Sequence, residues 1–415
     1  MAANPKQDSV DVLAVIRAPL EQYPPSVHQV ALLAEAGLRV AVVDTFHRRN
    51  TEISFTPGTS VQRIRTARHT VSHIEQFPSF PIRYWRAAQF GWKTFRALKS
   101  LRPKVVIAYD AQGCHAVGRV MLRRDWPQMV CHIHDFPGTD DYGIGTWLAN
   151  SYYLKFAREA HLVVVPDRGR AGVLMEQARL SCPPAVVMNC PRLLREIPRS
   201  TMSAHLGKVF NSDTRIVFFQ GWINEGKGLE TAVRSMKHWP ANSIFVLLGP
   251  ARPEYREKLL RLSHGAGAHG RLILIPMVPF TEVDAITAGA DVAFSIYPNP
   301  TDDLNWRYMA GASNKRFAYM SLGLPQVANR GHGMNEVIER PHCGLLVDPN
   351  SADEIGSAIR LLLENESLRH EMGRNGRQAH LTEFNYEKEF APVLKQIVEW
   401  CKFSSSSHAP AECST

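Results

Sequence analysis

The sequence lacks long hydrophobic runs, paired-cysteine motifs and tandem short repeats. No apolar stretch approaches the roughly 18 residues that a membrane-spanning helix needs, and neither end shows an apolar leader with a cleavage site. The seven cysteines are scattered and include no C-x-x-C pair, so we expect reduced thiols and no zinc site. These features together predict a cytoplasmic protein.

Acidic residues are scarce in one part of the chain, whose overall net charge is +9. Between Arg63 and Arg124 many Lys and Arg residues are opposed only by Glu75 and Asp110. Such a basic block favours a polyanion or an anionic membrane surface as its partner. A solvated protein face has the same composition, so both interpretations stay open.

Aromatic residues are interleaved with the cations in segment 83–99 of this block, where Trp85, Trp92 and Phe95 stand among Lys and Arg residues. An amphipathic helix of this kind could lie on an anionic membrane. Alternatively, its aromatic side chains pack into the core while its charges are solvated. Nucleic-acid binding is a third interpretation, but no stacking platform or known module supports it, so we expect no nucleic-acid partner.

The length and the hydrophobic pattern predict an α/β protein with two domains. The chain has 415 residues, which is longer than a domain with a single hydrophobic core usually is. Its 45% hydrophobic and 21% charged residues are typical of a globular protein. Short apolar runs typical of buried parallel strands alternate with helical patterns. We expect strands at residues 12–16, 40–44, 105–109, 129–133, 162–165, 215–219, 243–248, 272–275, 292–296, 326–328 and 344–347. The predicted domains span residues 1–200 and 213–385, followed by a helix at 386–403 and a disordered tail at 404–415.

Segment 313–325 predicts a helix whose start can bind an anion. Ser313 is a natural N-cap, Gly323 is a natural helix end, and Pro325 leads into a strand. Asn314 and Lys315 then fall in the first turn, as does Arg316, where backbone N–H groups are unpaired. A surface helix with basic residues at its start is the simpler alternative.

Segment 218–230 predicts a second phosphate-binding element, because a strand ends in a glycine-bearing loop and a helix starts after Lys227. Gly221 would let the backbone approach a diphosphate closely, and Lys227 would stabilise the charge on a departing phosphate. Gly249 and Val278 follow the next two strands at the same edge of the sheet. Alternatively, the residues after the strands are ordinary loop residues, and Lys227 is an exposed lysine in a loop.

Two further segments follow predicted strands. The glycine-rich turn at 331–336 contains Gly333 and Glu336, and an acidic residue there is also favoured by a helix start. In the first domain, His134 follows the strand at 129–133 and is itself followed by Asp135. A histidine at this position is suited to a binding crevice, although a structural role is an equal alternative.

These segments resemble the motifs of family-4 glycosyltransferases, retaining enzymes with two Rossmann-like domains that face each other across a cleft (the GT-B type). Residues 313–329 are similar to the family's PNKLFEYMAAGLPVVAS run, residues 218–230 to GRL…EKGLE, residues 331–349 to GGNPEVI…GLLVPP, and residues 371–386 to MGRNGR…FSW. The resemblance implies that the first domain binds the acceptor, that the second binds a nucleotide sugar, and that the last helix returns to the first domain.

The resemblance also implies the roles of single residues. Lys227 and His134 are expected to be catalytic. The residues expected to bind the donor are Gly221, Gly249, Val278, Ser313, Asn314, Lys315, Gly333 and Glu336. No metal and no cofactor besides the nucleotide sugar are expected, and the acceptor would be a glycan or a lipid-linked molecule at the inner face of a membrane.

This chain departs from the family pattern at three places. Trp222 stands where the family has an Arg, Ala310 and Ala318 stand where it has two glutamates, and Pro24-Pro25-Ser26 replaces a Gly-Gly loop. The leading hypothesis is a retaining glycosyltransferase of polysaccharide or glycolipid synthesis. A non-catalytic glycan- or partner-binding protein and a sugar-nucleotide epimerase remain the alternatives.

Overall fold

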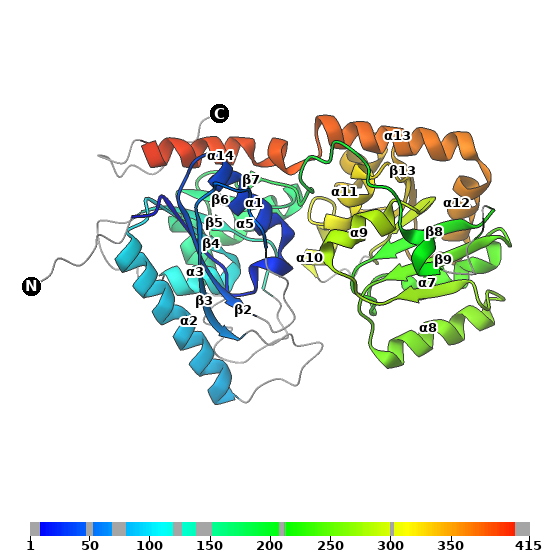
Figure 1. Ribbon diagram of the computed structural model, residues 1–415, viewed down its shortest axis with the longest axis horizontal. Coiled ribbons are helices and arrows are strands. Elements are labelled where there is room, and N and C mark those ends of the chain that lie inside the picture. Colours follow the sequence, from blue (N-terminus) through cyan, green and yellow to red (C-terminus); the bar gives the residue numbers. More distant parts are fainter. Residues whose placement is uncertain are drawn as a thin grey trace, which may run out of the picture. The chain divides into compact units, whose positions relative to one another are not determined.

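The computed structural model describes residues 9–46, 53–68, 80–118, 127–137, 152–206, 211, 213–298 and 303–402. The chain divides into two compact units, which are residues 1–188 with 389–415, and residues 189–388. Figure 1 shows the first unit from blue to blue-green with the end of the red helix, and the second from green to orange. The predicted tail at 404–415 lies outside the described residues. Within these ranges no helix has the length and apolar character needed to cross a membrane.

The first unit contains a seven-stranded parallel sheet in the order β3-β2-β1-β4-β5-β6-β7. Its central strands are buried, as expected for a sheet covered by helices on both faces. The strands are β1 (Val12–Val15), β2 (Val40–Phe46), β3 (Val61–Arg68), β4 (Val105–Tyr109), β5 (Gln128–His132), β6 (Leu162–Val165) and β7 (Ala185–Val186). The helices in its described residues are η1 (Leu20–Gln22), α1 (Pro24–Glu35), α2 (Phe80–Leu101), α3 (Asp110–Gly118), α5 (Arg168–Ala178) and α14 (Tyr386–Lys402), whose residues from Glu389 onward belong to this unit.

The second unit contains a six-stranded parallel sheet in the order β10-β9-β8-β11-β12-β13. Its strands are β8 (Arg215–Gln220), β9 (Ser243–Leu248), β10 (Leu272–Ile275), β11 (Val292–Ser295), β12 (Gln326–Asn329) and β13 (Gly344–Val347). Its helices are α6 (Met202–Leu206), α7 (Leu229–Ser235), η3 (Met236–His238), α8 (Pro253–Gly265), α9 (Phe280–Thr287), α10 (Leu304–Arg307), α11 (Asn314–Ser321), η4 (Asn335–Glu339), α12 (Ala352–Glu364) and α13 (Glu366–Thr382).

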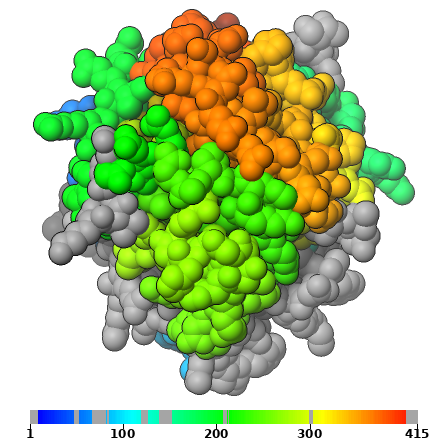
Figure 2. Space-filling view, turned by 90° about the vertical axis from the view of Figure 1, so that its right-hand side faces the viewer, coloured from blue at the N-terminus to red at the C-terminus, as the bar shows by residue number. Residues whose placement is uncertain are grey.

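Two apolar clusters cover the opposite faces of the second sheet, because side chains alternate along each strand. In β8, Val217 and Phe219 belong to the cluster that includes α7 and α12, whereas Ile216 and Phe218 belong to the cluster that includes α6 and α9. Figure 2 shows one face of this unit, where the segment of α12 and α13 is orange and that of α7 and α8 is green.

All eleven predicted strands are present, with ends that differ by no more than two residues. The sequence analysis missed β3 and β7. β3 has no continuous apolar run, because Arg63 and Arg65 interrupt it. Pro24-Pro25-Ser26, which stand where the family has a Gly-Gly loop, form the first turn of α1.

The positive charge of the basic block is partly neutralised in the folded protein. Arg63 forms ion pairs with Asp44 and Glu21, and Arg65 lies 3.3 Å from Glu21, so acids from outside the block neutralise part of it. Residues 69–79 and 119–126 of the block lie outside the described residues. In α2 the alternative of core-packed aromatics is wrong for Trp85, Trp92 and Phe95, which are 61%, 55% and 41% exposed.

The cysteines are buried free thiols at Cys114, Cys131, Cys190, Cys343 and Cys401. Among the described residues no cluster of three His, Cys, Asp or Glu side chains could hold a metal ion.

Candidate functional site

The second sheet reverses its strand order between β8 and β11, and open α/β sheets bind ligands outside the carboxyl ends of their strands at such a point. Gly221 follows β8 directly, and Tyr297 follows β11 by two residues. Gly249, after β9, has a φ of +145°, and a Cβ atom there would lie 2.0 Å from the carbonyl oxygen of Gly221. Only glycine therefore allows the two loops to approach this closely.

Two lysines converge at this reversal point. The Lys227 Nζ atom lies 4.2 Å from the ring centre of Trp306 and 5.2 Å from that of Tyr297. The Lys315 Nζ atom lies 4.8 Å from the same Tyr297 ring and 3.8 Å from the ring centre of Phe219. The structure thus brings together two residues that the sequence analysis had placed in separate motifs.

The electrostatics of the lysine pair favour an anionic ligand. Burial lowers the pKa of Lys315 well below its ordinary value, and the charges of Lys227 and Arg316 lower it further. Among the described residues no hydrogen bond or ion pair of the Lys315 side chain is present. A dianion would relieve both the desolvation of this ammonium group and its repulsion by the neighbouring cations.

Helix α11 begins at Asn314, as predicted, and ends before Gly323, whose φ is +68°. The Ser313 side chain makes no capping hydrogen bond, and its Oγ atom lies 3.0 Å from the hydroxyl oxygen of Tyr297. The expectation that Arg316 adds a cation to the helix start is wrong. Its guanidinium is buried and donates to the backbone carbonyls of Met309 and Ala310, at 3.0 and 3.1 Å.

The remaining predicted donor-binding residues lie after other strands of the same sheet or at the start of α11. Val278 follows β10 and packs against one apolar cluster, whereas Asn314 is exposed at the start of α11. Gly333 has a φ of +72°, and its carbonyl accepts from the N–H of Glu336 at 3.2 Å. The donor-binding roles of these four residues stay predictions.

Aromatic residues of this region were not singled out by the sequence analysis. Tyr297 and Trp306 lie 5.6 Å apart between ring centres, and Tyr308 lies 5.1 Å from the ring of His332 in the glycine-rich turn. The position of Tyr297 just after a buried strand was the one signal that could have marked it. Trp306 follows no strand, so its contact with Lys227 could not be foreseen.

The two positions of the missing family glutamates differ in their surroundings. Ala310 is buried and its carbonyl accepts from Arg316, whereas Ala318 is half-buried in α11.

In the first unit, His134 is part of a buried polar cluster at the carboxyl ends of β4 and β5. Its Nε2 atom lies 2.8 Å from the Ser26 hydroxyl, and its backbone N–H donates to the Asp110 carboxylate at 2.7 Å. The Arg170 guanidinium donates to the His134 carbonyl and, at 2.8 Å, to the Asp135 carboxylate. The peptide that carries His134 is therefore held on both sides.

Burial shifts the protonation of this cluster. It lowers the pKa of His134 to about 4, with Asp135 acting against the shift and Arg170 reinforcing it. Burial, reinforced by the charge of Asp135, also raises the pKa of Asp110 to about 7. His134 is thus a neutral imidazole near neutral pH, held by Ser26, and its predicted catalytic role stays a prediction.

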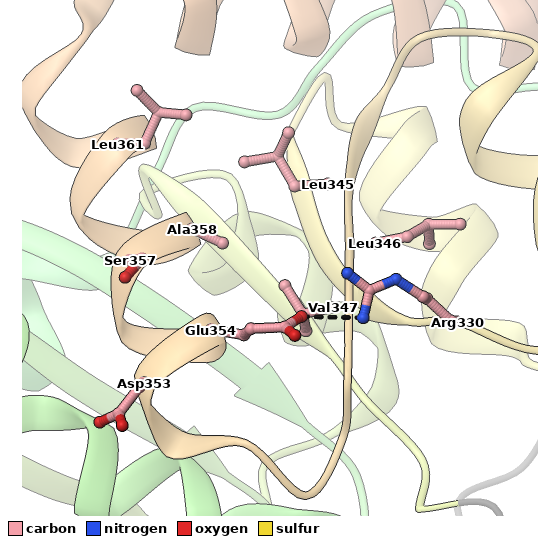
Figure 3. Close-up of a pocket in the computed structure, with 9 residues that line it drawn as sticks. All are labelled: Arg330, Leu345, Leu346, Val347, Asp353, Glu354, Ser357, Ala358 and Leu361. Carbon is pink, nitrogen blue, oxygen red and sulfur yellow. Dashed lines mark hydrogen bonds and ion pairs between the residues drawn. The ribbon is translucent and has the colours of Figure 1, made fainter.

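A shallow hollow of about 510 Å³ lies elsewhere on the second unit, between β13 and α12 (Figure 3). Leu345, Leu346 and Leu361 contribute apolar surface to it, and Arg330 forms an ion pair with Glu354 at 2.8 Å. None of the predicted donor-binding residues lines this hollow, and its charged groups are paired.

The fold matches solved structures over nearly the whole chain. The sucrose-phosphate synthase of Thermosynechococcus elongatus has a TM-score of 0.70 at 16% identity and covers 95% of this chain and 100% of its own. HepE of Anabaena, solved with UDP and glucose, has a TM-score of 0.67 at 14% identity and covers 94% of this chain and 100% of its own. The two parallel-sheet Rossmann-like domains are those of the GT-B glycosyltransferase fold, so the predicted fold class is confirmed.

The second unit also matches a family by sequence. Residues 205–379 match the family described as "Glycosyl transferases group 1". An uncharacterized glycosyltransferase of Methanocaldococcus jannaschii is 26% identical over 190 residues, which are 43% of this chain and 45% of that relative. This match over part of the chain and the GT-B fold both point to a glycosyltransferase.

Proposed function

We propose that the protein is a retaining glycosyltransferase of family 4 that moves a sugar from a nucleoside-diphosphate donor to a hydroxyl acceptor. The observation that carries the proposal is the pair of ammonium groups, on Lys227 and Lys315, at the reversal point of the second sheet. Two cations beside glycine-lined strand ends match the charge and the shape of a diphosphate.

The retaining outcome rests on the sequence resemblance. In the proposed reaction the bond between the anomeric carbon and the diphosphate oxygen breaks, and the acceptor oxygen bonds to the same face of that carbon. The acceptor proton passes to the departing diphosphate, whose charge Lys227 and Lys315 stabilise. The proposal includes no metal, so we expect EDTA to leave the activity unchanged.

The experiment is turnover of a panel of UDP- and GDP-sugars with glycan and lipid-linked acceptors, with the anomeric configuration of the product read by NMR. A product with the donor's configuration supports the proposal, and an inverted product contradicts the retaining mechanism. A changed sugar released without acceptor would indicate the epimerase alternative. Binding of a glycan without turnover of any donor would indicate the non-catalytic alternative.

We further propose that the acceptor is held at an anionic membrane surface at the inner face of the membrane, where it enters cell-surface polysaccharide or glycolipid synthesis. The exposed Trp85, Trp92 and Phe95 of α2 support this, together with Arg96, whose guanidinium lies 4.8 Å above the Trp92 ring. Aromatic side chains beside cations suit the interface of an anionic bilayer.

Sedimentation with vesicles tests the membrane proposal. We expect binding to vesicles that contain phosphatidylglycerol, weaker binding to phosphatidylcholine alone, and loss of binding when Trp85 and Trp92 are both changed to Ser. Phe280→Ser is the matched control, because Phe280 is an exposed aromatic residue of the second unit. Equal binding by the double variant and the control would contradict the proposal.

A further inference from the structure

Three aromatic rings surround the lysine pair: Phe219 in β8, Tyr297 after β11 and Trp306 in α10. Lys227 contacts the faces of Trp306 and Tyr297, and Lys315 contacts those of Phe219 and Tyr297, all at 3.8–5.2 Å from Nζ to the ring centre. Tyr297 is shared by both lysines and therefore links the two contacts. We call these three rings the aromatic box.

We propose that the aromatic box positions the two ammonium groups for the donor diphosphate, and that Trp306 is the positioning residue for Lys227. The inference rests on the proposed function of the same site and adds residues that hold its cations. It makes Trp306 a determinant of affinity for nucleoside diphosphates without direct contact with the reacting atoms.

Aromatic faces are suited to this task for an electrostatic reason. A ring face attracts a cation through its quadrupole but carries no formal charge, so it does not repel an arriving diphosphate. A carboxylate in the same place would repel the ligand and compete with it for the ammonium groups.

The rings are themselves fixed by the fold. The Tyr297 hydroxyl lies 3.0 Å from Ser313 Oγ, and its backbone N–H donates to Asn329 at 3.0 Å. Phe219 is fully buried in β8. Two of the three rings therefore have rigid supports from the sheet and from the start of α11.

Trp306 is held by a short element outside the sheet. The Asp303 carboxylate accepts from the N–H of Asn305 at 2.8 Å and caps α10, and the Trp306 ring packs edge-on to Tyr297. Gly226, with a φ of +82°, passes beside this ring, and a Cβ atom there would lie 3.5 Å from it. Lys227 and its neighbour Gly226 thus both lie beside the Trp306 ring.

The test compares the affinity for UDP and for GDP, by calorimetry, of wild type, Trp306→Leu and Trp306→Phe. Leu keeps apolar bulk but has no ring face, whereas Phe keeps the face, so Phe should rescue what Leu loses. We expect Trp306→Leu to weaken binding by about threefold to thirtyfold and Trp306→Phe to stay within about twofold of wild type. Phe46→Leu, which removes an exposed aromatic ring of the first unit, is the matched control and should bind as wild type does.

The outcomes separate the inference from the function on which it rests. If wild type binds a nucleotide and the Leu and Phe variants bind it with the same affinity as each other, the role of Trp306 is overturned and the diphosphate site remains supported. Absence of wild-type binding at millimolar UDP and GDP overturns the diphosphate site and the aromatic box together. Thermal unfolding of each variant shows that a change in affinity is not a loss of fold.

Discussion

Lys315 and Arg316 are neighbours in helix α11 and both lie near Tyr297, whose ring centre is 5.7 Å from the Arg316 guanidinium carbon, but their cationic groups otherwise make different contacts. The Lys315 ammonium faces the rings of Phe219 and Tyr297 beside Lys227, whereas the Arg316 guanidinium is buried among the carbonyls of Met309, Ala310 and Ser295. One cation is therefore placed for a ligand and the other for the fold.

Substitution of these two residues should separate binding from stability. We expect Arg316→Met to lower the free energy of unfolding by roughly 3 kcal/mol, because it leaves buried carbonyls without a donor. Lys315→Met should not lower stability, since it replaces a desolvated cation by an apolar side chain, but it should weaken UDP binding about tenfold or more. Urea unfolding and calorimetry measure the two effects, and a stable Arg316→Met protein would contradict the assignment.

The affinity for nucleoside diphosphates should fall as the pH rises. Burial and the neighbouring cations, Lys227 and Arg316, lower the pKa of Lys315, and Tyr297 and Phe219 are the rings that face it. A bound dianion favours the protonated lysine, so binding should take up a proton above the lowered pKa. Calorimetry in buffers of different ionisation enthalpy detects this uptake. Lys315→Arg should abolish it, and the same uptake in that variant would refute the explanation.

Asp110 should make stability fall with increasing pH. Its pKa in the folded protein is raised to about 7, mainly by burial, so ionisation between pH 4 and pH 7 destabilises the fold. Asn at this position keeps an acceptor for the His134 N–H and tolerates the φ of +54°. We expect Asp110→Asn to gain stability relative to wild type as the pH rises from 4 to 8. A constant difference in unfolding free energy across this range would show that Asp110 is not responsible.

Ser26→Ala should reveal whether His134 acts in turnover. The change removes the partner of a buried imidazole nitrogen and should cost about 1–3 kcal/mol of stability. If His134 is catalytic, turnover of a nucleotide sugar should also fall, because its ring loses the contact that orients it. Ser263→Ala, a buried serine of α8, is the control. Unchanged turnover in Ser26→Ala at full donor saturation would favour a structural role for His134.

Gly249→Ala should disrupt the donor-binding edge. Its Cβ atom would overlap the Gly221 carbonyl at a φ that side chains rarely adopt, so we expect lower thermal stability and weaker UDP binding. Gly265→Ala is the control, because a Cβ atom there meets nothing within 4 Å. Equal melting temperatures and affinities for the two variants would contradict this account of the loop.

Hydrophobic patterning was enough to predict the parallel strands, because buried strands of such sheets are continuous apolar runs. It failed for β3, where arginines that pair with Glu21 and Asp44 interrupt the run. Long-range charge pairing of this kind leaves no local signal in the sequence.

Motif spacing located Lys227, Lys315 and the glycines that follow the strands, because these residues stand at fixed places relative to strand ends. It could not show that Arg316 points into the core, or that Trp306 reaches Lys227. Both depend on packing between segments that lie apart in the chain.

The most direct measurement of the central claim is calorimetric titration of UDP and GDP into wild type and into the Lys227→Ala, Lys315→Met double variant at pH 7. The account predicts that wild type binds at least one of the two nucleotides and that the folded double variant binds neither at millimolar concentration. Equal affinity in the two proteins, or no binding by wild type, would contradict the claim that this lysine pair holds the diphosphate of a sugar donor.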